Sequence, residues 1–267
     1  MCINTASVPD KIRAVAQAGF EAIEMWHTDL VHYKPSEIKR MLADNNIKLG
    51  EIAKMEGWFE NDGTLMDTSD VMGECKRRME FARELDCPYI VALPSRSDRG
   101  FYRSWEEGVE AYRKLLEFGE QIGICPTLEF IGQSEQVNSV DKALKFLEDA
   151  GGGKTIVDVF HIWRGTGNVD DFERVPLDKI SLLHFHDAGS SSPRTEYKDR
   201  DRVMPGDGII DLRRFVEIAN GKGFAGMVSL GVYNHANWSR DPYEVAREGM
   251  DKMSRYFQSI KISAAGD

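Results

Sequence analysis

Three polar residues that could bind a divalent metal ion stand at the ends of three successive apolar segments of this 267-residue chain: Glu129, Asp158 and His184. Two carboxylates and one imidazole form a ligand set that suits Mn²⁺, Mg²⁺, Co²⁺ or Zn²⁺. Polar side chains within apolar strands are costly unless they are paired or bound to a metal. One such residue alone would more often belong to an ion pair, but three in succession indicate a site for one divalent metal ion.

The elements that would bring these residues together are predicted along the whole chain, where short apolar, β-branched runs alternate with amphipathic stretches. We expect eight strands, over Ile3–Ala6, Ala22–Trp26, Ile47–Ala53, Tyr89–Leu93, Thr127–Ile131, Thr155–Val159, Ile180–His186 and Met227–Tyr233. We expect helices over Asp10–Ala18, Ser36–Asn45, Val71–Leu85, Glu106–Ile122, Val140–Ala150, Leu212–Asn220 and Tyr243–Phe257. This repeat, without a linker or a shift in composition, predicts an α/β fold that is a single (β/α)8 TIM barrel over residues 1–267.

The main alternative is an open, doubly wound sheet that binds a nucleotide. Such a fold would place a GxGxxG turn after the first strand, and the sequence has none there. In a closed barrel, side chains at the C-terminal ends of separate strands point into one mouth, where the active sites of this fold lie. Glu129, Asp158 and His184 would therefore converge at that mouth.

Composition narrows the class of protein further. A net charge of −10, spread along the chain, argues against a nucleic-acid partner, which needs a basic face. The sequence has no apolar segment near the roughly 20 residues that cross a bilayer and no secretory signal over Met1–Ser7, so we expect no membrane association and a cytoplasmic location. The four cysteines lack metal-binding spacing and are interpreted as reduced packing residues. A small-molecule partner suits this surface better.

Four stretches of the sequence occur in the order TLEFIG, VDVFH, LLHFHD and DRVMPGDGIIDL. With these stretches the chain resembles the sugar phosphate isomerase/epimerase superfamily, which has a xylose isomerase-like barrel. It is most similar to the inosose isomerase branch of that superfamily. The resemblance covers most of the chain and is densest over residues 125–238. In that family a Glu, an Asp, a His and a second Glu from successive strands hold one divalent metal ion. The resemblance therefore implies Glu129, Asp158 and His184 as ligands. The fourth ligand falls on Gly231, within SLGVYN, and glycine offers no side chain.

The resemblance also implies substrate-binding residues at the barrel mouth, namely His161, Arg202, Glu24, Trp26 and His186. Relatives use a histidine at the position of His161 to contact a substrate hydroxyl or carbonyl, and Arg202 matches a substrate-binding arginine. Strand alternation puts His186 on the same side as His184, where it could replace or support that ligand.

Two further segments are interpreted from their residue types. The run Arg194 to Arg202 alternates in charge and is expected to form a mobile lid over the mouth, with an exposed loop as the alternative. His27 and His32 are expected in a solvated loop after the second strand rather than in a second metal site.

The ligand set implies enolisation chemistry. A metal ion that holds the carbonyl and hydroxyl oxygens of a keto sugar or keto inositol stabilises the enediolate formed when the adjacent C–H proton leaves. In similar enzymes two metal-bound glutamates act as base and acid on opposite faces of the substrate. Glu129 would be one member of that pair, and Gly231 stands where the other is expected.

Gly231 leaves three hypotheses. The first is an active enzyme in which His186, His235, Glu51 or a metal-bound water replaces the glutamate, including a keto-sugar, inosose or dehydroshikimate dehydratase that needs a single base. The second is an isomerase impaired by a Glu-to-Gly change, natural or engineered. The third is a non-catalytic sugar or cyclitol binder. The sequence favours a metal-dependent isomerase or epimerase of a keto sugar or inosose, and analogy with other barrels suggests a homo-oligomer.

Overall fold

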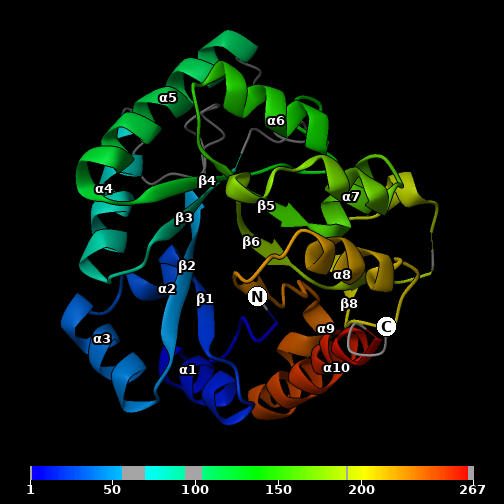
Figure 1. The fold of residues 1–267 in the computed structure, drawn as a ribbon. Coiled ribbons are helices and arrows are strands. Elements are labelled where there is room, and N and C mark those ends of the chain that lie inside the picture. Colours follow the sequence, from blue (N-terminus) through cyan, green and yellow to red (C-terminus); the bar gives the residue numbers. More distant parts are fainter. Residues whose placement is uncertain (1, 56–69, 94–103, 191, 264–267) are drawn as a thin grey trace.

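The computed structural model describes residues 2–55, 70–93, 104–190 and 192–263, with side chains as far as 257. Parallel strands form one curled sheet in the order β1-β2-β3-β4-β5-β6-β9, and the helices lie around its outside (Figure 1). The strands are β1 (Ala22–Trp26), β2 (Lys48–Met55), β3 (Tyr89–Ala92), β4 (Cys125–Glu129), β5 (Lys154–Asp158), β6 (Ile180–His184) and β9 (Val228–Ser229). This arrangement confirms the α/β TIM-barrel fold.

The long helices agree with their predicted positions to within a few residues, except that the last continues past Phe257. Their ends follow local chemistry: Ser104 and Glu107 form a capping box at the start of α5, and Gly123 follows its end with φ of 76°. These helices are α1 (Val8–Gln17), α3 (Pro35–Asp44), α4 (Val71–Glu84), α5 (Trp105–Ile122), α6 (Val140–Asp149), α8 (Leu212–Gly221) and α10 (Pro242–Ser263). Shorter ones are α2 (His27–Leu30), α7 (Val159–Gly165) and α9 (His235–Trp238).

The predicted first strand, Ile3–Ala6, is wrong. This segment forms turns, in which the Ala6 N–H donates to the Ile3 carbonyl at 3.2 Å. Ser7 immediately caps α1, because its Oγ accepts a hydrogen bond from the Asp10 N–H, so few residues are left for a strand. The described residues therefore give a nearly closed sheet of seven strands, without a ladder between β1 and β9.

A small antiparallel hairpin that the sequence analysis missed follows β6. It pairs β7 (Asp187–Ala188) with β8 (Arg202–Val203). The buried Asp187 carboxylate accepts hydrogen bonds from the backbone N–H groups of Gly206, Gly208 and Ile210 and thereby holds the returning chain. The hairpin brings Arg202 back beside the ends of the central strands.

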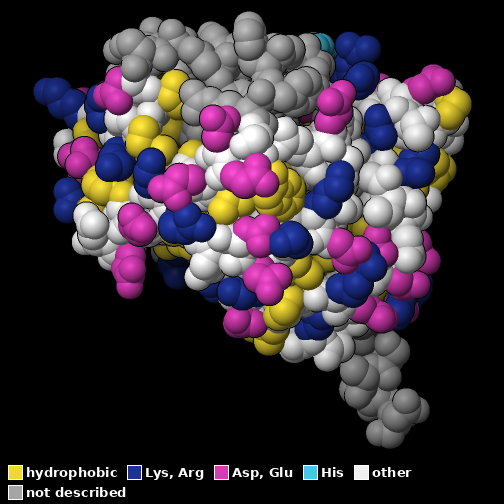
Figure 2. Space-filling model, turned by 90° about the horizontal axis from the view of Figure 1, so that it is seen from above, with side chains coloured by type: hydrophobic (Ala, Val, Ile, Leu, Met, Phe, Trp, Pro, Cys, Tyr) yellow, Lys and Arg dark blue, Asp and Glu magenta, His cyan; other side chains and the backbone are white. Residues whose placement is uncertain are grey.

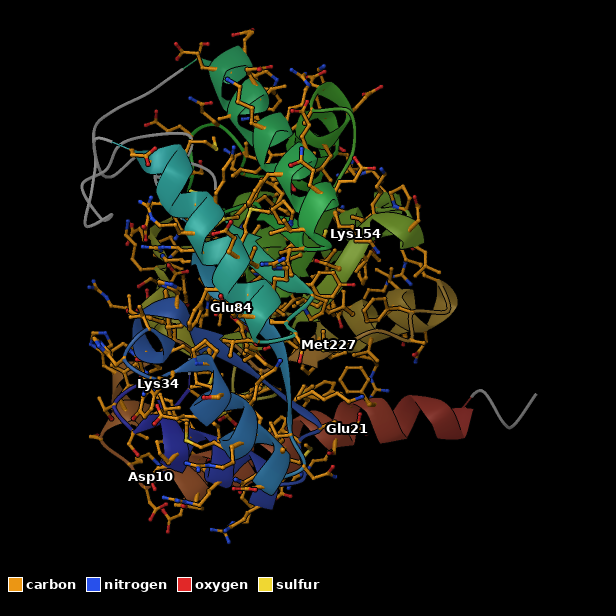
Figure 3. All side chains as sticks on the ribbon, turned by 90° about the vertical axis from the view of Figure 1, so that its left-hand side faces the viewer. Asp10, Glu21, Lys34, Glu84, Lys154 and Met227 are labelled. Atoms are coloured by element: carbon orange, nitrogen blue, oxygen red, sulfur yellow. The ribbon has the colours of Figure 1, made fainter. Side chains whose placement is uncertain are left out.

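The two ends of the barrel differ in what they carry. Figure 3 shows Glu21, Lys154 and Met227, which lie at or just before the starts of β1, β5 and β9, toward one end. The C-terminal ends of the strands, which carry the predicted ligands, lie at the opposite end. On the face in Figure 2, acidic and basic side chains are interspersed. None of the described helices combines the length and hydropathy that a membrane-spanning helix requires.

Candidate metal and substrate site

The three predicted metal ligands lie together. Glu129, Asp158 and His184 are the last residues of β4, β5 and β6, and Asp158 pairs directly with His184 in the parallel register. The Nδ1 atom of His184 lies 3.1 Å from Glu129 Oε1 and 3.4 Å from Asp158 Oδ2. All three side chains are buried. Their role as ligands stays a prediction, but the geometry it requires is present.

His161 adds a fourth side chain, and a second imidazole, to this group. The Asp158 carboxylate caps α7 by accepting a hydrogen bond from the His161 N–H at 2.9 Å, which turns the chain back toward the strand ends. His161 Nε2 then lies 3.9 Å from both Glu129 Oε1 and Asp158 Oδ2. The ligand atoms of Glu129, Asp158 and His161 all fall within 4.8 Å of one another.

Arg202 is a buried cation in contact with the position where the fourth ligand was expected. Its guanidinium donates to the Gly231 carbonyl oxygen at 3.2 Å and to Asp199 Oδ1 at 2.9 Å. It also lies 3.5 Å from Asp158 Oδ2 and stacks over the Phe160 ring. Gly231 therefore contributes a backbone oxygen to a cationic contact instead of a carboxylate to a metal.

His186 lies behind Asp158. Its Nε2 atom is 3.2 Å from Asp158 Oδ1, and the side chain is fully buried. Burial lowers the pKa of His186 to about 4, although Asp158 opposes this effect. Because His186 does not line the cavity at the barrel mouth, its place among the described residues suits orientation of Asp158 better than contact with substrate.

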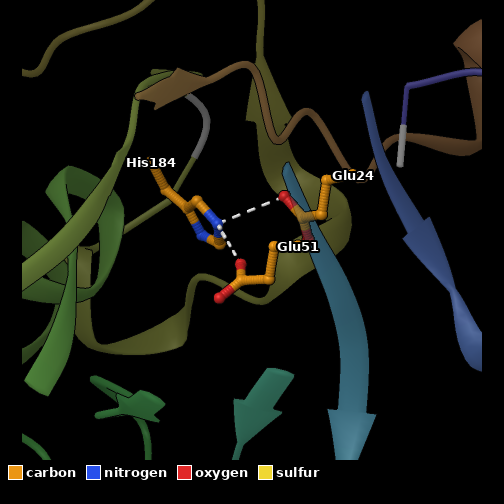
Figure 4. Close-up of side chains that lie close together, drawn as sticks. All are labelled: Glu24, Glu51 and His184. Atoms are coloured by element: carbon orange, nitrogen blue, oxygen red, sulfur yellow. Dashed lines mark ion pairs between the residues drawn. The ribbon is translucent and has the colours of Figure 1, made fainter. Parts of the chain in front are cut away.

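A second pair of carboxylates faces the other nitrogen of His184 (Figure 4). His184 Nε2 lies 3.3 Å from Glu24 Oε2 and 3.8 Å from Glu51 Oε2. Glu51 is buried within β2, where Thr127 Oγ1 donates to its Oε1 atom at 2.8 Å. From the sequence, Glu51 was predicted as a possible replacement acid or base, but its position beside His184 was not predicted. An acidic residue inside the apolar run LGEIA was the available signal.

The electrostatic effect of this crowding differs between the carboxylates. Burial raises the pKa of Glu51 to about 7. Burial also opposes the charge of Glu24, but the neighbouring His184 outweighs it and lowers the pKa of Glu24 to about 2. For His184, burial disfavours the cation, yet Glu24, Asp158 and Glu129 together raise its pKa. The cluster therefore favours a positive charge at its centre.

The mouth of the barrel contains a cavity of about 340 Å³. Five residues predicted from the sequence line it: Glu24, Trp26, Glu129, His161 and Arg202. Lys54, Asp199 and Tyr233 also line it and were not predicted. Lys54 Nζ lies 5.1 Å from the centre of the Trp26 ring, so a cation borders the aromatic wall. The cavity is large enough for a small polyhydroxylated molecule.

The predicted lid reaches the cavity at Asp199 and Arg202, whereas His27, His32 and His235 do not line it. His32 is exposed in a turn, but the expectation of a solvated loop is wrong for His27, which begins α2 and packs edge-on against Phe81. His235 is exposed in α9. At the start of the predicted lid, the Arg194 side chain donates to backbone carbonyls at the end of α7, including that of Arg164 at 2.6 Å. The lid function of this segment stays a prediction.

The side chains at the strand ends fit a divalent metal ion. Asp158 Oδ2 is buried without a hydrogen-bond partner among the described residues, and a buried carboxylate oxygen of this kind is costly. Glu129 Oε1, His184 Nδ1 and His161 Nε2 surround it. Mixed oxygen and nitrogen donors suit Zn²⁺, Mn²⁺ or Co²⁺.

Comparison with known proteins gives consistent matches. A family model described as Xylose isomerase-like TIM barrel matches residues 12–256. A protein of Halalkalibacterium halodurans named inosose isomerase is 27% identical over 267 residues, with 94% of each chain covered. A 3-dehydroshikimate dehydratase of Pseudomonas aeruginosa is 25% identical over 86% of this chain, but over 37% of its own length. A crystal structure described as IOLI protein with a binding zinc atom has a TM-score of 0.83 at 21% identity and covers 95% of this chain and 94% of its own.

Proposed function

The chain belongs to the xylose isomerase-like TIM barrel family, and from that premise we propose that it is a divalent-metal-dependent isomerase or epimerase of a keto sugar or inosose. The observation that carries the proposal is the convergence of Glu129, Asp158 and His184 at a polar cavity. The inosose isomerase of H. halodurans and the zinc in a structural neighbour support the same choice of substrate class and cofactor.

Glu129, Asp158 and His184 would hold the metal ion. When bound, the ion would supply Lewis acidity that stabilises negative charge developing on a substrate carbonyl oxygen. Glu129 lines the cavity and would take the proton from the carbon beside that carbonyl, which forms the enediolate. His161 and Arg202 line the same cavity and would orient substrate oxygens by donating hydrogen bonds.

A second proton-transfer group is needed for isomerisation or epimerisation. The side chains that the sequence suggested as replacements for the missing glutamate do not line the mouth cavity. They are His186 and Glu51, which are buried, and His235, which is exposed in α9. Glu24 does line it, at the end of β1. We therefore assign Glu24 as the carboxylate that would act with Glu129.

A dehydratase of a keto sugar or inosose is the second candidate function. It is favoured by Gly231, because elimination can proceed with a single carboxylate base. The relative in P. aeruginosa that is named 3-dehydroshikimate dehydratase supports this second candidate.

Solvent deuterium exchange would test the proposal. Metal-loaded protein would be incubated in heavy water with a panel of keto sugars and inososes, and substrate and products would be followed by NMR. We expect deuterium at the carbon beside the carbonyl and an isomeric product, and we expect Glu129→Gln to lose both. Loss of water from the substrate would select the dehydratase. Tight substrate binding with neither exchange nor product would leave the non-catalytic binder.

A further inference from the structure

We propose that the chain binds a second divalent metal ion between Glu24, Glu51 and the Nε2 atom of His184. This site is separate from the ligand set Glu129, Asp158 and His184 Nδ1, although it shares one imidazole ring with it. Three strands supply it: β1 carries Glu24, β2 carries Glu51 and β6 carries His184.

The spacing of the three side chains suits one ion. Their ligand atoms lie within 4.8 Å of one another, and Nε2 is 3.3 Å from Glu24 Oε2 and 3.8 Å from Glu51 Oε2. Ligands about 2.1 Å from a tetrahedral metal ion lie about 3.4 Å apart. The carboxylates therefore stand near coordinating distance without a large movement of the backbone.

Two of these atoms lie in ion pairs but make no hydrogen bond among the described residues. Glu51 Oε2 and His184 Nε2 are buried without a hydrogen-bond partner among the described residues. Their side chains are each 1% exposed, and both point into the same space (Figure 4). Leaving such atoms unsatisfied is costly, and a cation between them would satisfy both at once.

Neighbouring hydroxyl groups hold the two carboxylates in place. Thr127 Oγ1 donates to the other oxygen of Glu51 at 2.8 Å, and Ser229 Oγ donates to Glu24 at 2.9 Å. Hydrogen bonds of this kind orient metal-binding carboxylates and leave an oxygen lone pair for the ion. The site is thus prepared by residues of β4 and β9 as well as by its own strands.

Two ions would also balance the charge of the whole cluster. Glu24 and Glu51 face one nitrogen of His184, while Glu129 and Asp158 face the other. Arg202 is the cation described beside them, in contact with Asp158. If His184 lost both ring protons and bridged two divalent ions, the ions and the arginine together would balance the four carboxylates and the imidazolate. A buried excess of negative charge would thereby be removed.

A cavity smaller than the one at the barrel mouth lies beside the second site. This cavity, of about 110 Å³, borders Glu24 and Glu51 on the side of Ser229 and Gly50. That volume holds a few water molecules, which could complete the coordination of the ion. The proposed second ion therefore serves to bind β1, β2 and β6 together and to fix the ring of His184, while the mouth cavity receives the substrate.

Metal stoichiometry tests the proposal. Purified apoprotein would be dialysed to equilibrium against Zn²⁺, and zinc per chain would be measured by mass spectrometry with circular dichroism as a check of folding. We expect two ions in the wild type, one in Glu51→Gln and one in Glu129→Gln. Glu173→Gln, which removes an exposed carboxylate, is the matched control and should keep two. One ion in the wild type, unaffected by Glu51→Gln, would overturn the proposal. If Glu51→Gln unfolds, Glu24→Gln takes its place.

A spectroscopic measurement tests the shared ring. Cu²⁺ would be titrated into apoprotein and followed by electron paramagnetic resonance. Two Cu²⁺ ions on one imidazolate couple their spins, so the signal should grow over the first equivalent and shrink over the second. In Glu51→Gln the loss at the second equivalent should disappear. Two independent, additive signals in the wild type would contradict the bridge. Both readouts are independent of deuterium exchange, so failure of the proposed enzyme activity would be recognised separately.

Discussion

The backbone N–H of Gly132 donates a hydrogen bond to Nδ1 of His161 across 3.2 Å. Nδ1 is then the acceptor, and a neutral His161 ring carries its proton on Nε2. Nε2 lies 3.0 Å from a guanidinium nitrogen of Arg202, so two hydrogen-bond donors meet at one place in the mouth cavity. A negatively polarised oxygen of the substrate is the group that would accept from both.

Arg202→Lys should weaken substrate binding. The guanidinium contacts Asp199, the Gly231 carbonyl and His161 at the same time, and a single ammonium group cannot reproduce this fork. We expect an increase in Kd for the keto substrate of about tenfold, or ~1.4 kcal/mol, measured by calorimetry on metal-loaded protein. The matched control is Arg200→Lys, because Arg200 is exposed and lies two residues before Arg202. If both variants bound the keto substrate with equal affinity, Arg202 would not be a substrate-binding residue.

Gly132→Ala should disturb the position of His161. A Cβ atom at residue 132 would lie 2.5 Å from the His161 carbonyl oxygen, which is backbone and cannot move aside cheaply. We expect a loss of about 1–3 kcal/mol in the free energy of unfolding, measured by denaturant titration. Gly221→Ala is the control: its Cβ would meet open space at the end of α8, and the variant should be as stable as the wild type or more so.

Gly231→Glu should increase affinity for the metal ion. The new side chain would begin beside Arg202, which contacts both the Gly231 carbonyl and Asp158, and its carboxylate could supply the ligand expected at this position. We expect about tenfold tighter binding of Mn²⁺ or Zn²⁺, or ~1.4 kcal/mol, in competition with a chelator. An accompanying rise in turnover would identify the wild-type residue as the cause of an impaired isomerase. Unchanged affinity would show that Arg202 keeps the new carboxylate from the ion.

His27 should make stability depend on pH. Burial lowers its pKa from 6.5 to about 4, and the charge of Arg78 acts in the same direction. Between these values the unfolded chain binds a proton that the folded chain does not, so stability is lost as the pH falls from 6.5 toward 4. The slope is at most about 1.4 kcal/mol per pH unit. Denaturant titrations at several pH values should show a smaller slope for His27→Phe. The exposed His32→Asn is the control and should keep the wild-type slope.

The strands and the main ligand group could be predicted because both depend on local patterns. Apolar runs located β4, β5 and β6, and the parallel arrangement of a barrel then requires their C-terminal residues, Glu129 and Asp158 among them, to meet. Glu51 could not be placed in the same way. It lies four residues before the end of β2, and its approach to His184 depends on the curvature of the sheet rather than on its position in the sequence.

Context also explains the errors. Ile3–Ala6 has the composition of a strand, but the cap that starts α1 directly afterwards shortens the segment. His27 has a polar side chain in a region that reads as a loop, and its burial arises from α4, which brings Phe81 against the ring. Neither effect can be read from the residues of the segment alone.

The hydrogen bond from Ser229 to Glu24 joins β9 to β1, between which the described residues form no backbone ladder. A single side-chain hydrogen bond breaks more readily than a row of backbone hydrogen bonds. Its acceptor, Glu24, is also a ligand of the proposed second ion. Local opening of the sheet should therefore occur mainly between β1 and β9. We expect faster amide hydrogen exchange in these two strands than in β4 and β5. Metal binding should slow amide hydrogen exchange in β1 and β9 before it slows exchange elsewhere. The occupancy of the metal site would then determine how often the barrel opens between these two strands.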